Sequence, residues 1–172
     1  MSIIGSYLRL APAEIVRARE EPGWARAFKA EQAAGERLRG PAELRFHDTD
    51  KAWAGLAHLF ARHGLPTEVI HGGEPLTGDG DEDGDEDWGY GPPFLLAPDV
   101  VADAARQLAD VPFGALADGL APADLAAAEV YPTGLWARDP FALEYLAAHH
   151  AALLRYLTRT ARYRHGLLLW YS

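Results

Sequence analysis

Hydrophobic side chains recur at spacings of three and four residues in three long stretches of this chain. Such spacing places them along one face of a helix, and that face is buried against the core of the domain. The predicted helices and their buried positions are 50–63 with Trp53, Leu56, Ala57 and Phe60, 98–109 with Val101, Ala105 and Leu108, and 140–165 with Leu143, Leu146, His150, Leu153, Leu157 and Ala161.

Shorter apolar runs predict β-strands, two of them near the ends of the sequence. Residues 3–10 carry apolar side chains on both strand faces, and residues 167–171 are almost entirely apolar. Strands of this kind are typical of a sheet that is covered on both sides. Residues 67–71 and 94–96 predict two further strands, and residues 44–46 predict a short extended segment.

Small and polar residues predict where the helices begin and end. Side-chain oxygens of residues 48–50 can cap the helix over 50–63, and Gly64 can end it. Asp139, followed by Pro140, predicts the start of the last helix. Shorter helices are expected near 12–21, 24–34, 112–118 and 122–128, and aromatic-rich loops near 88–93 and 131–136.

Together these elements predict a single α+β domain over residues 1–172. We expect five to seven helices around a small, mostly antiparallel sheet that contains both terminal strands. Gly55 lies inside a predicted helix, where glycine costs about 1 kcal/mol relative to alanine. This cost indicates that another element or a ligand approaches the backbone closely, and close helix packing is the favoured explanation.

Composition excludes several classes of protein. The chain has no cysteine, so it can form neither a disulfide framework nor a thiolate metal site. It has no run of 18 apolar residues, and its N-terminus lacks the basic and apolar regions of a signal peptide. We therefore expect a bacterial cytoplasmic protein that does not enter a membrane.

Negative charge is concentrated in one segment. The net charge is −9, and it would be −2 without the seven acidic residues between 79 and 87. A chain without a net basic face is not expected to bind nucleic acid. Residues 78–87 contain no apolar side chain, so we predict a mobile loop anchored by Trp88 and Tyr90. The segment resembles a calcium-binding loop only in part, because Tyr90 stands where the bidentate glutamate belongs.

No motif in the sequence predicts a metal or a cofactor. None of the seven histidines has a recognised metal-ligand spacing, and no phosphate-binding glycine motif is present. Serine occurs only at positions 2, 6 and 172, which leaves little basis for a serine nucleophile.

Several short motifs, taken in order, resemble one known family. They are Ile3-Ile4-Gly5-Ser6-Tyr7-Leu8-Arg9, Asp50-Lys51-Ala52-Trp53-Ala54-Gly55-Leu56, Gly72-Gly73-Glu74-Pro75-Leu76, Gly89-Tyr90-Gly91-Pro92, Tyr131-Pro132 and Leu143-Glu144-Tyr145-Leu146. In this combination the chain resembles the YfbM-like family of small bacterial proteins, a domain of unknown function. The resemblance implies a compact α+β domain and no mechanism. The long acidic insertion before Trp88 departs from it.

Two hypotheses for function follow. The leading one is a module that binds or inhibits a basic protein partner, as immunity proteins do, because a negative segment accelerates association with a positive surface. The alternative is a small enzyme or ligand-binding domain with a cleft near the 50–63 helix and the 71–75 and 88–93 loops. Its catalytic candidates are His58 and Glu74, and its ligand-binding candidates are Asp50, Lys51, Trp53, His71, Tyr90 and Trp136.

Overall fold

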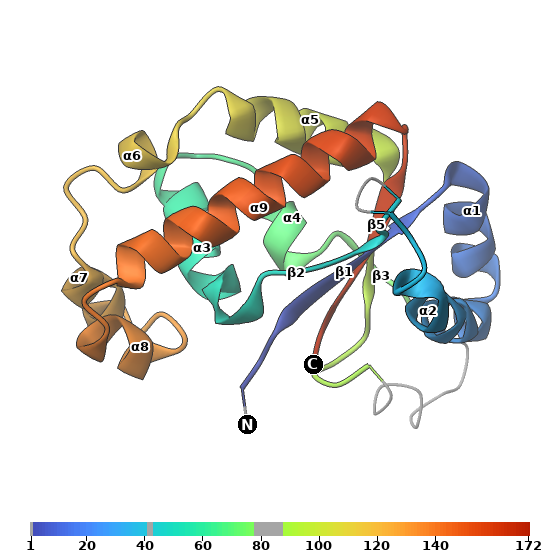
Figure 1. The fold of residues 1–172 in the computed structure, drawn as a ribbon, viewed down its shortest axis with the longest axis horizontal. Helices are drawn as coiled ribbons and strands as arrows, with labels where there is room; N and C mark the ends of the chain where they lie inside the picture. Colours follow the sequence, from blue (N-terminus) through green and yellow to red (C-terminus); the bar gives the residue numbers. More distant parts are fainter. Residues whose placement is uncertain (1, 41–42, 78–87) are drawn as a thin grey trace.

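A five-stranded antiparallel sheet organises the computed structural model of this protein, which describes residues 2–40, 43–77 and 88–172 (Figure 1). The strand order is β2-β1-β5-β4-β3, so the two terminal strands pair at its centre. The strands are β1 (Gly5–Leu10), β2 (Phe46–Asp48), β3 (Glu74–Pro75), β4 (Phe94–Leu96) and β5 (Gly166–Tyr171). The α+β fold and the pairing of the terminal strands are as the sequence predicts.

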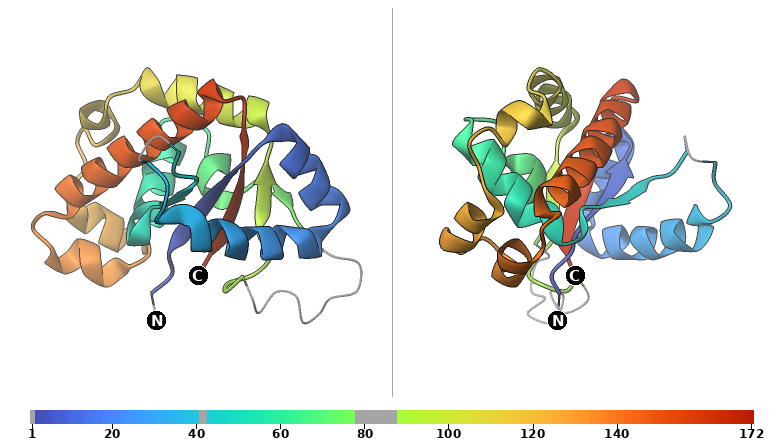
Figure 2. Two further views of the ribbon diagram at one scale, coloured as in Figure 1. Left: turned by 45° about the vertical axis from the view of Figure 1, so that its right-hand side comes forward. Right: turned by 60° about the vertical axis from the view of Figure 1, so that its left-hand side comes forward.

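Helices cover both faces of this sheet (Figure 2). One layer contains α1 and α2, and the opposite layer contains the remaining helices (Figure 1). The described helices are α1 (Pro12–Glu20), α2 (Pro22–Glu36), the 3-10 helix η1 (Asp50–Ala52), α3 (Trp53–Arg62), α4 (Glu68–His71), α5 (Pro98–Ala109), α6 (Phe113–Leu116), α7 (Pro122–Ala127), α8 (Thr133–Arg138) and α9 (Ala142–Arg162). The described residues thus contain nine α-helices, more than the five to seven expected.

Successive side chains of β1 and β5 point alternately to the two faces of the sheet, and this explains why helices pack on both faces. On β1, Leu8 and Leu10 pack with α1 and α2, whereas Tyr7 packs with the larger helical layer. On β5, Leu168 packs with α1 and α2, and Leu167 packs with the larger helical layer. Successive side chains of a strand point to opposite faces, so both faces of these strands are buried, as their composition predicts.

Helix α9 is the longest helix of the larger layer and packs along α5. Its buried residues include Leu146, His150, Leu153 and Leu157, which belong to the predicted stripe. The predicted start at Pro140 is two residues early. Instead, Asp139 accepts a hydrogen bond from the Phe141 backbone N–H at 2.8 Å before the helix begins at Ala142.

Two predicted elements are wrong in type. Residues 67–71 form helix α4 rather than a strand, and residues 131–136 run into helix α8 rather than forming a loop. In α4, Val69 and Ile70 are both fully buried. A single helical turn that packs against the core can bury two neighbouring residues in this way. Tertiary burial here overrides the strand preference of β-branched side chains.

The start of the 50–63 helix also differs from the prediction. The helix begins as η1 with Thr49 at the N-cap position, which lies within the predicted residues 48–50, but the Thr49 side chain makes no capping hydrogen bond. The Asp48 carboxylate accepts a hydrogen bond from the Asp50 backbone N–H at 3.1 Å. The Thr49 hydroxyl instead donates to the Gly5 carbonyl at 3.1 Å, which ties this segment to β1. Gly64, with φ of 63°, ends α3 as expected. Helix α1 ends at Glu20, and α2 begins at Pro22, two residues before the predicted start at residue 24.

Some predictions fall outside the described residues. The prediction of a mobile loop over residues 78–87 and the comparison of this segment with a calcium-binding loop belong to this group. The anchor after it is described. Trp88 is buried against Trp170, and the Tyr90 backbone N–H donates to the Tyr171 carbonyl at 2.9 Å. Among the described helices, none is long and apolar enough to cross a membrane.

Candidate functional site

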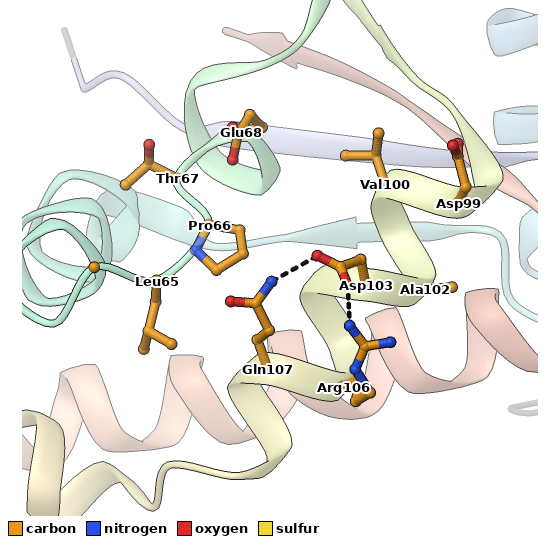
Figure 3. Close-up of a pocket in the computed structure, with 11 residues that line it drawn as sticks. Leu65, Pro66, Thr67, Glu68, Asp99, Val100, Ala102, Asp103, Arg106 and Gln107 are labelled. Atoms are coloured by element: carbon orange, nitrogen blue, oxygen red, sulfur yellow. Dashed lines mark hydrogen bonds and ion pairs between the residues drawn. The ribbon is translucent and has the colours of Figure 1, made fainter.

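A groove of about 820 Å³ lies between the α3–α4 connection and helix α5 (Figure 3). Residues 64–68 form one wall, where the positive φ of Gly64 turns the chain away from α3. The other wall is the outer face of α5 between Asp99 and Gln107. The sequence reasoning did not predict this groove, because its walls lie more than 30 residues apart along the chain.

The groove combines apolar side chains with an excess of negative charge. Three carboxylates line it, from Glu68, Asp99 and Asp103, against one guanidinium, from Arg106. Figure 3 shows that Asp103 is engaged by both Arg106 and Gln107, whose amide donates to it at 2.6 Å. The other two carboxylates stay exposed, so the groove favours a positively charged ligand.

A second candidate site is a polar seam where α9 crosses β2 and η1 (Figure 1). We define the seam as His47, Asp50, Tyr145, His149 and Tyr156. Spacings of four and seven residues place its three α9 members on one helix face. Tyr145 and His149 contact edge-to-face with ring centroids 4.6 Å apart, and His47 stacks on Tyr156 at 4.9 Å.

Asp50 is the strained member of the seam. Its φ is 45°, a left-handed conformation that is uncommon for residues other than glycine. Its carboxylate accepts a hydrogen bond from the Tyr145 hydroxyl at 3.0 Å, and that hydroxyl accepts one from the Lys51 backbone N–H at 3.1 Å. Burial, together with the hydrogen bond to Asp50, raises the pKa of Tyr145 well above its usual range.

The protonation states of two seam residues, His47 and Tyr145, do not suit acid–base catalysis. Burial lowers the pKa of His47 to about 4, and its buried Nε2 atom has no hydrogen-bond partner. An efficient general acid or base has a pKa near the working pH. At neutral pH, both His47 and Tyr145 are therefore uncharged groups suited to hydrogen bonding rather than to proton transfer.

The lowered pKa of His47 predicts a pH dependence of stability. Between about pH 6.5 and pH 4 the unfolded chain binds a proton at this residue and the folded protein does not, so stability falls as the pH is lowered. From pH 7 to pH 5 we expect wild type to lose on the order of 1–2 kcal/mol more than His47→Phe, which keeps the stacked ring. Urea unfolding at the two pH values measures this difference.

The control for this experiment is His71→Phe, which replaces an exposed histidine at the end of α4. We expect this variant to keep the pH dependence of wild type. If His47→Phe also keeps it, His47 is not the residue responsible.

The structure brings four of the ligand-binding candidates into two neighbouring groups. Asp50 and Lys51 share the Tyr145 hydroxyl, as described above. Trp53 packs on Tyr171 with ring centroids 4.9 Å apart, and the backbone of Tyr90 hydrogen-bonds to the same residue. The Trp53 indole N–H donates to the Ile3 carbonyl at 3.0 Å, so it ties the N-terminal segment to α3.

The two catalytic candidates do not join these groups. Glu74 lies on β3 and Asp50 follows β2, and these two strands are the opposite edges of the sheet. The Glu74 carboxylate pairs with Arg19 of α1 at 2.7 Å, and this hydrogen bond lowers its pKa. His58 is half-buried on α3. Among the described residues, neither an ion pair nor a hydrogen bond joins Glu74 to Asp50, Lys51 or Tyr90, and the enzymatic cleft stays a prediction.

Trp136, the last ligand-binding candidate, belongs to the core. Its side chain is 2% exposed, and its indole N–H donates to the Val130 carbonyl at 2.9 Å. A Cβ at Gly55 would lie 2.7 Å from Leu146 and 3.0 Å from Trp136. Close helix packing, the favoured explanation for Gly55, is therefore confirmed, and it leaves Trp136 no surface for a ligand.

The sequence reasoning missed His47, Tyr145, Tyr156 and Arg9 as notable positions. Arg9 had a visible signal, because it is the charged residue in a strand otherwise expected to be buried on both faces. The other three residues had no such signal, because their contacts with one another depend on how α9 crosses β2. Among the described residues, no group of three or more His, Asp or Glu side chains is arranged to hold a metal ion.

Comparisons with known proteins identify relatives without an assigned activity. A family model described as "Domain of unknown function (DUF1877)" matches residues 1–170. The crystal structure of YfbM from Escherichia coli, a protein of unknown function, is similar in fold, with a TM-score of 0.63 and 16% sequence identity over 98% of this chain and 99% of that chain. No curated protein matches the sequence. The resemblance to YfbM-like proteins is thus confirmed.

Proposed function

We propose that this chain, which belongs to the DUF1877 family of domains of unknown function, is a cytoplasmic module that binds a basic segment of a protein partner. The observation that carries this proposal is the groove between the α3–α4 connection and α5. This groove combines open volume, apolar contact surface and an excess of one charge. Within the seam, His47 and Tyr145 are buried groups suited to stacking and hydrogen bonding, and the carboxylate of Glu74 is paired with Arg19.

The apolar part of the groove gives a partner something to bury. Leu65, Pro66, Val100 and Ala102 line it, and Val100 is 39% exposed although it is a large aliphatic residue. An apolar anchor of the partner placed against these side chains would gain roughly 25 cal/mol for each Å² of apolar surface removed from water.

The charges of the groove select the partner and set its orientation. Lysine or arginine side chains of a partner segment can pair with Glu68 and Asp99, which are both exposed. The net charge of −9 attracts a positive surface over longer distances, and this attraction is screened within about 8 Å at physiological salt. Inhibition of a basic toxin or nuclease, an immunity-type role, is the narrower form of the proposal.

The test places a positive charge in the groove. In Val100→Arg we expect the partner captured by immobilised wild-type protein from host lysate at low salt to be lost, because the arginine fills the apolar surface and repels a basic segment. The matched control is Val16→Arg on α1, on the other side of the sheet, where valine is 49% exposed. This control is expected to retain the partner. Capture is quantified by mass spectrometry of the bound fraction.

Salt provides a second readout. Binding of a basic partner should weaken steeply as the salt concentration rises, because the attraction between exposed charges is screened. The proposal fails if no protein is captured even at low salt, or if Val100→Arg and Val16→Arg retain the same protein equally well.

A further inference from the structure

Arg9 lies in an unusual environment for a charged residue. It is on β1, in the centre of the sheet, and its side chain faces the layer that contains α9. The residue is only 5% exposed. Its backbone is fixed on both sides, by the pairing with Leu167 of β5 and by a hydrogen bond from its N–H to the Arg45 carbonyl at 2.9 Å.

The guanidinium of Arg9 has no anionic partner among the described residues. Its Nε and Nη1 atoms are buried without a hydrogen bond. Two carboxylates contact the Arg45 segment beside it, and neither forms an ion pair with Arg9. Glu14 pairs with Arg45 at 2.8 Å. The Oε1 atom of Glu36 accepts hydrogen bonds from the Arg45 and Phe46 backbone N–H groups at 2.9 and 3.0 Å, and its Oε2 atom, buried without a hydrogen bond, lies 3.7 Å from the Nε atom of Arg39.

A buried guanidinium without a partner is costly. Arginine stays protonated in proteins, so it cannot avoid the cost by losing its proton. Buried charges are almost always paired because removing an ion from water is expensive. Burial lowers the pKa of Arg9, the positive charges of Arg45 and Arg159 act in the same direction, and Tyr156 and Tyr163 act against it. Among the described residues, no carboxylate forms an ion pair with Arg9 to offset its burial.

The side chains that cover Arg9 can give a ligand access to its guanidinium. The Tyr163 ring covers the guanidinium, with 4.6 Å between the Cζ atom of Arg9 and the ring centroid. Tyr163 directly follows α9 and is 52% exposed, so a change of its side-chain rotamer can uncover Arg9 without moving the backbone. His165, whose ring lies 5.6 Å from that of Tyr163, also has a buried nitrogen, Nδ1, without a partner.

We propose that Arg9 anchors a binding site for a small oxyanion, a phosphate or carboxylate group, which takes the place of the Tyr163 ring above the guanidinium. The planar guanidinium presents several N–H donors to such a group and forms strong charge-assisted hydrogen bonds with it. His165, uncharged because burial lowers its pKa, adds a donor when its proton is on Nδ1. This site is separate from the groove between the α3–α4 connection and α5.

Thermal unfolding in the presence of defined anions tests the site. Sodium phosphate and sodium acetate are the two probes, and sodium chloride at equal ionic strength is the reference. A ligand that binds only the folded state raises Tm by mass action, by about 4 °C at ten times Kd for a domain of this size. A larger rise with phosphate identifies a phosphate site, and a larger rise with acetate identifies a carboxylate site.

Two variants separate specific binding from general salt effects. Arg9→Met keeps most of the side-chain volume without the charge, and we expect it to lose the anion-specific rise in Tm. Arg138→Met, at an exposed arginine of α8, is the matched control and should keep the rise. Phosphate also stabilises proteins non-specifically, so an equal rise in wild type and Arg9→Met overturns the proposal.

A direct measurement on wild type decides the question if Arg9→Met does not fold. The Arg9 Nε–H group gives its own signal in a ¹H–¹⁵N NMR spectrum. A saturable shift of this signal with phosphate or acetate, absent with chloride, supports the site. Phosphate and acetate that leave the signal unchanged, or shift it no more than chloride does, contradict the site.

Discussion

Replacement of Gly72 by alanine is expected to destabilise the protein by about 3–5 kcal/mol, which combines backbone strain with a clash. Gly72 ends α4 with φ of 89° and ψ of 166°, a region that is almost exclusive to glycine. A Cβ there would lie 2.5 Å from the Cβ of Phe94, on the neighbouring strand β4. Urea unfolding monitored by tryptophan fluorescence measures the loss.

Gly91→Ala is the matched control, because Gly91 also has a positive φ but has no neighbouring atom for a Cβ to clash with. Its φ is 83°, and a Cβ at this position would meet no atom within 4 Å. We expect a loss of about 1–2 kcal/mol from strain alone. If the two variants lose the same stability, the approach of Phe94 contributes nothing and the strain explains both.

Trp136→Ala, which truncates a core side chain, should destabilise the protein by about 4–5 kcal/mol. The side chain fills the space between α3 and α9, and its removal also leaves the Val130 carbonyl without its indole donor. Such a loss approaches the whole stability of a domain of this size. Circular dichroism during thermal unfolding should therefore show a large fall in Tm, or no cooperative transition.

The comparison for Trp136 is Phe141→Ala, which removes another large aromatic side chain. Phe141 precedes α9 and is 66% exposed. Substitutions at such surface positions change stability by roughly 0.5 kcal/mol or less. A small effect of Trp136→Ala, similar to that of Phe141→Ala, would contradict the core role of Trp136 and reopen its candidacy as a ligand-binding residue.

The partner-binding proposal and the Arg9 proposal stand on separate surfaces and can fail separately. The first depends on Val100 and the carboxylates of the groove, and the second on a guanidinium beneath Tyr163. A variant that abolishes one activity should leave the other intact, since additive behaviour is normal for distant sites.

Hydrophobic periodicity by itself determined the long elements of this protein. Helix α5 begins and ends where its pattern predicts, from Pro98 to Ala109, because Pro98 fixes the start and three apolar residues define one face. The stripe of α9 and the burial of both faces of β1 and β5 follow for the same reason. In each case the local preference and the burial in the fold favour the same structure.

Short segments were decided by the tertiary structure. The sequence of residues 67–71 is typical of a strand, yet α4 forms there because Val69 and Ile70 are both buried in the core. Their backbone carbonyls accept hydrogen bonds from the hydroxyls of Tyr7 and Tyr171. A segment of four or five residues has too little intrinsic preference to resist such contacts. The helix start near Asp50 changed for a similar reason, because Thr49 bonds to Gly5 of β1 instead of capping.

The candidate sites depended on the fold most of all. Sequence alone determined the charge, the absence of thiol chemistry and the glycine at which helices pack closely. It could not determine that Asp50 meets Tyr145, that Glu74 is paired with Arg19 at the far edge of the sheet, or that Arg9 lies beneath Tyr163. Each of these pairs joins residues more than 50 positions apart, and only the packing of helices on the sheet decides which distant side chains meet.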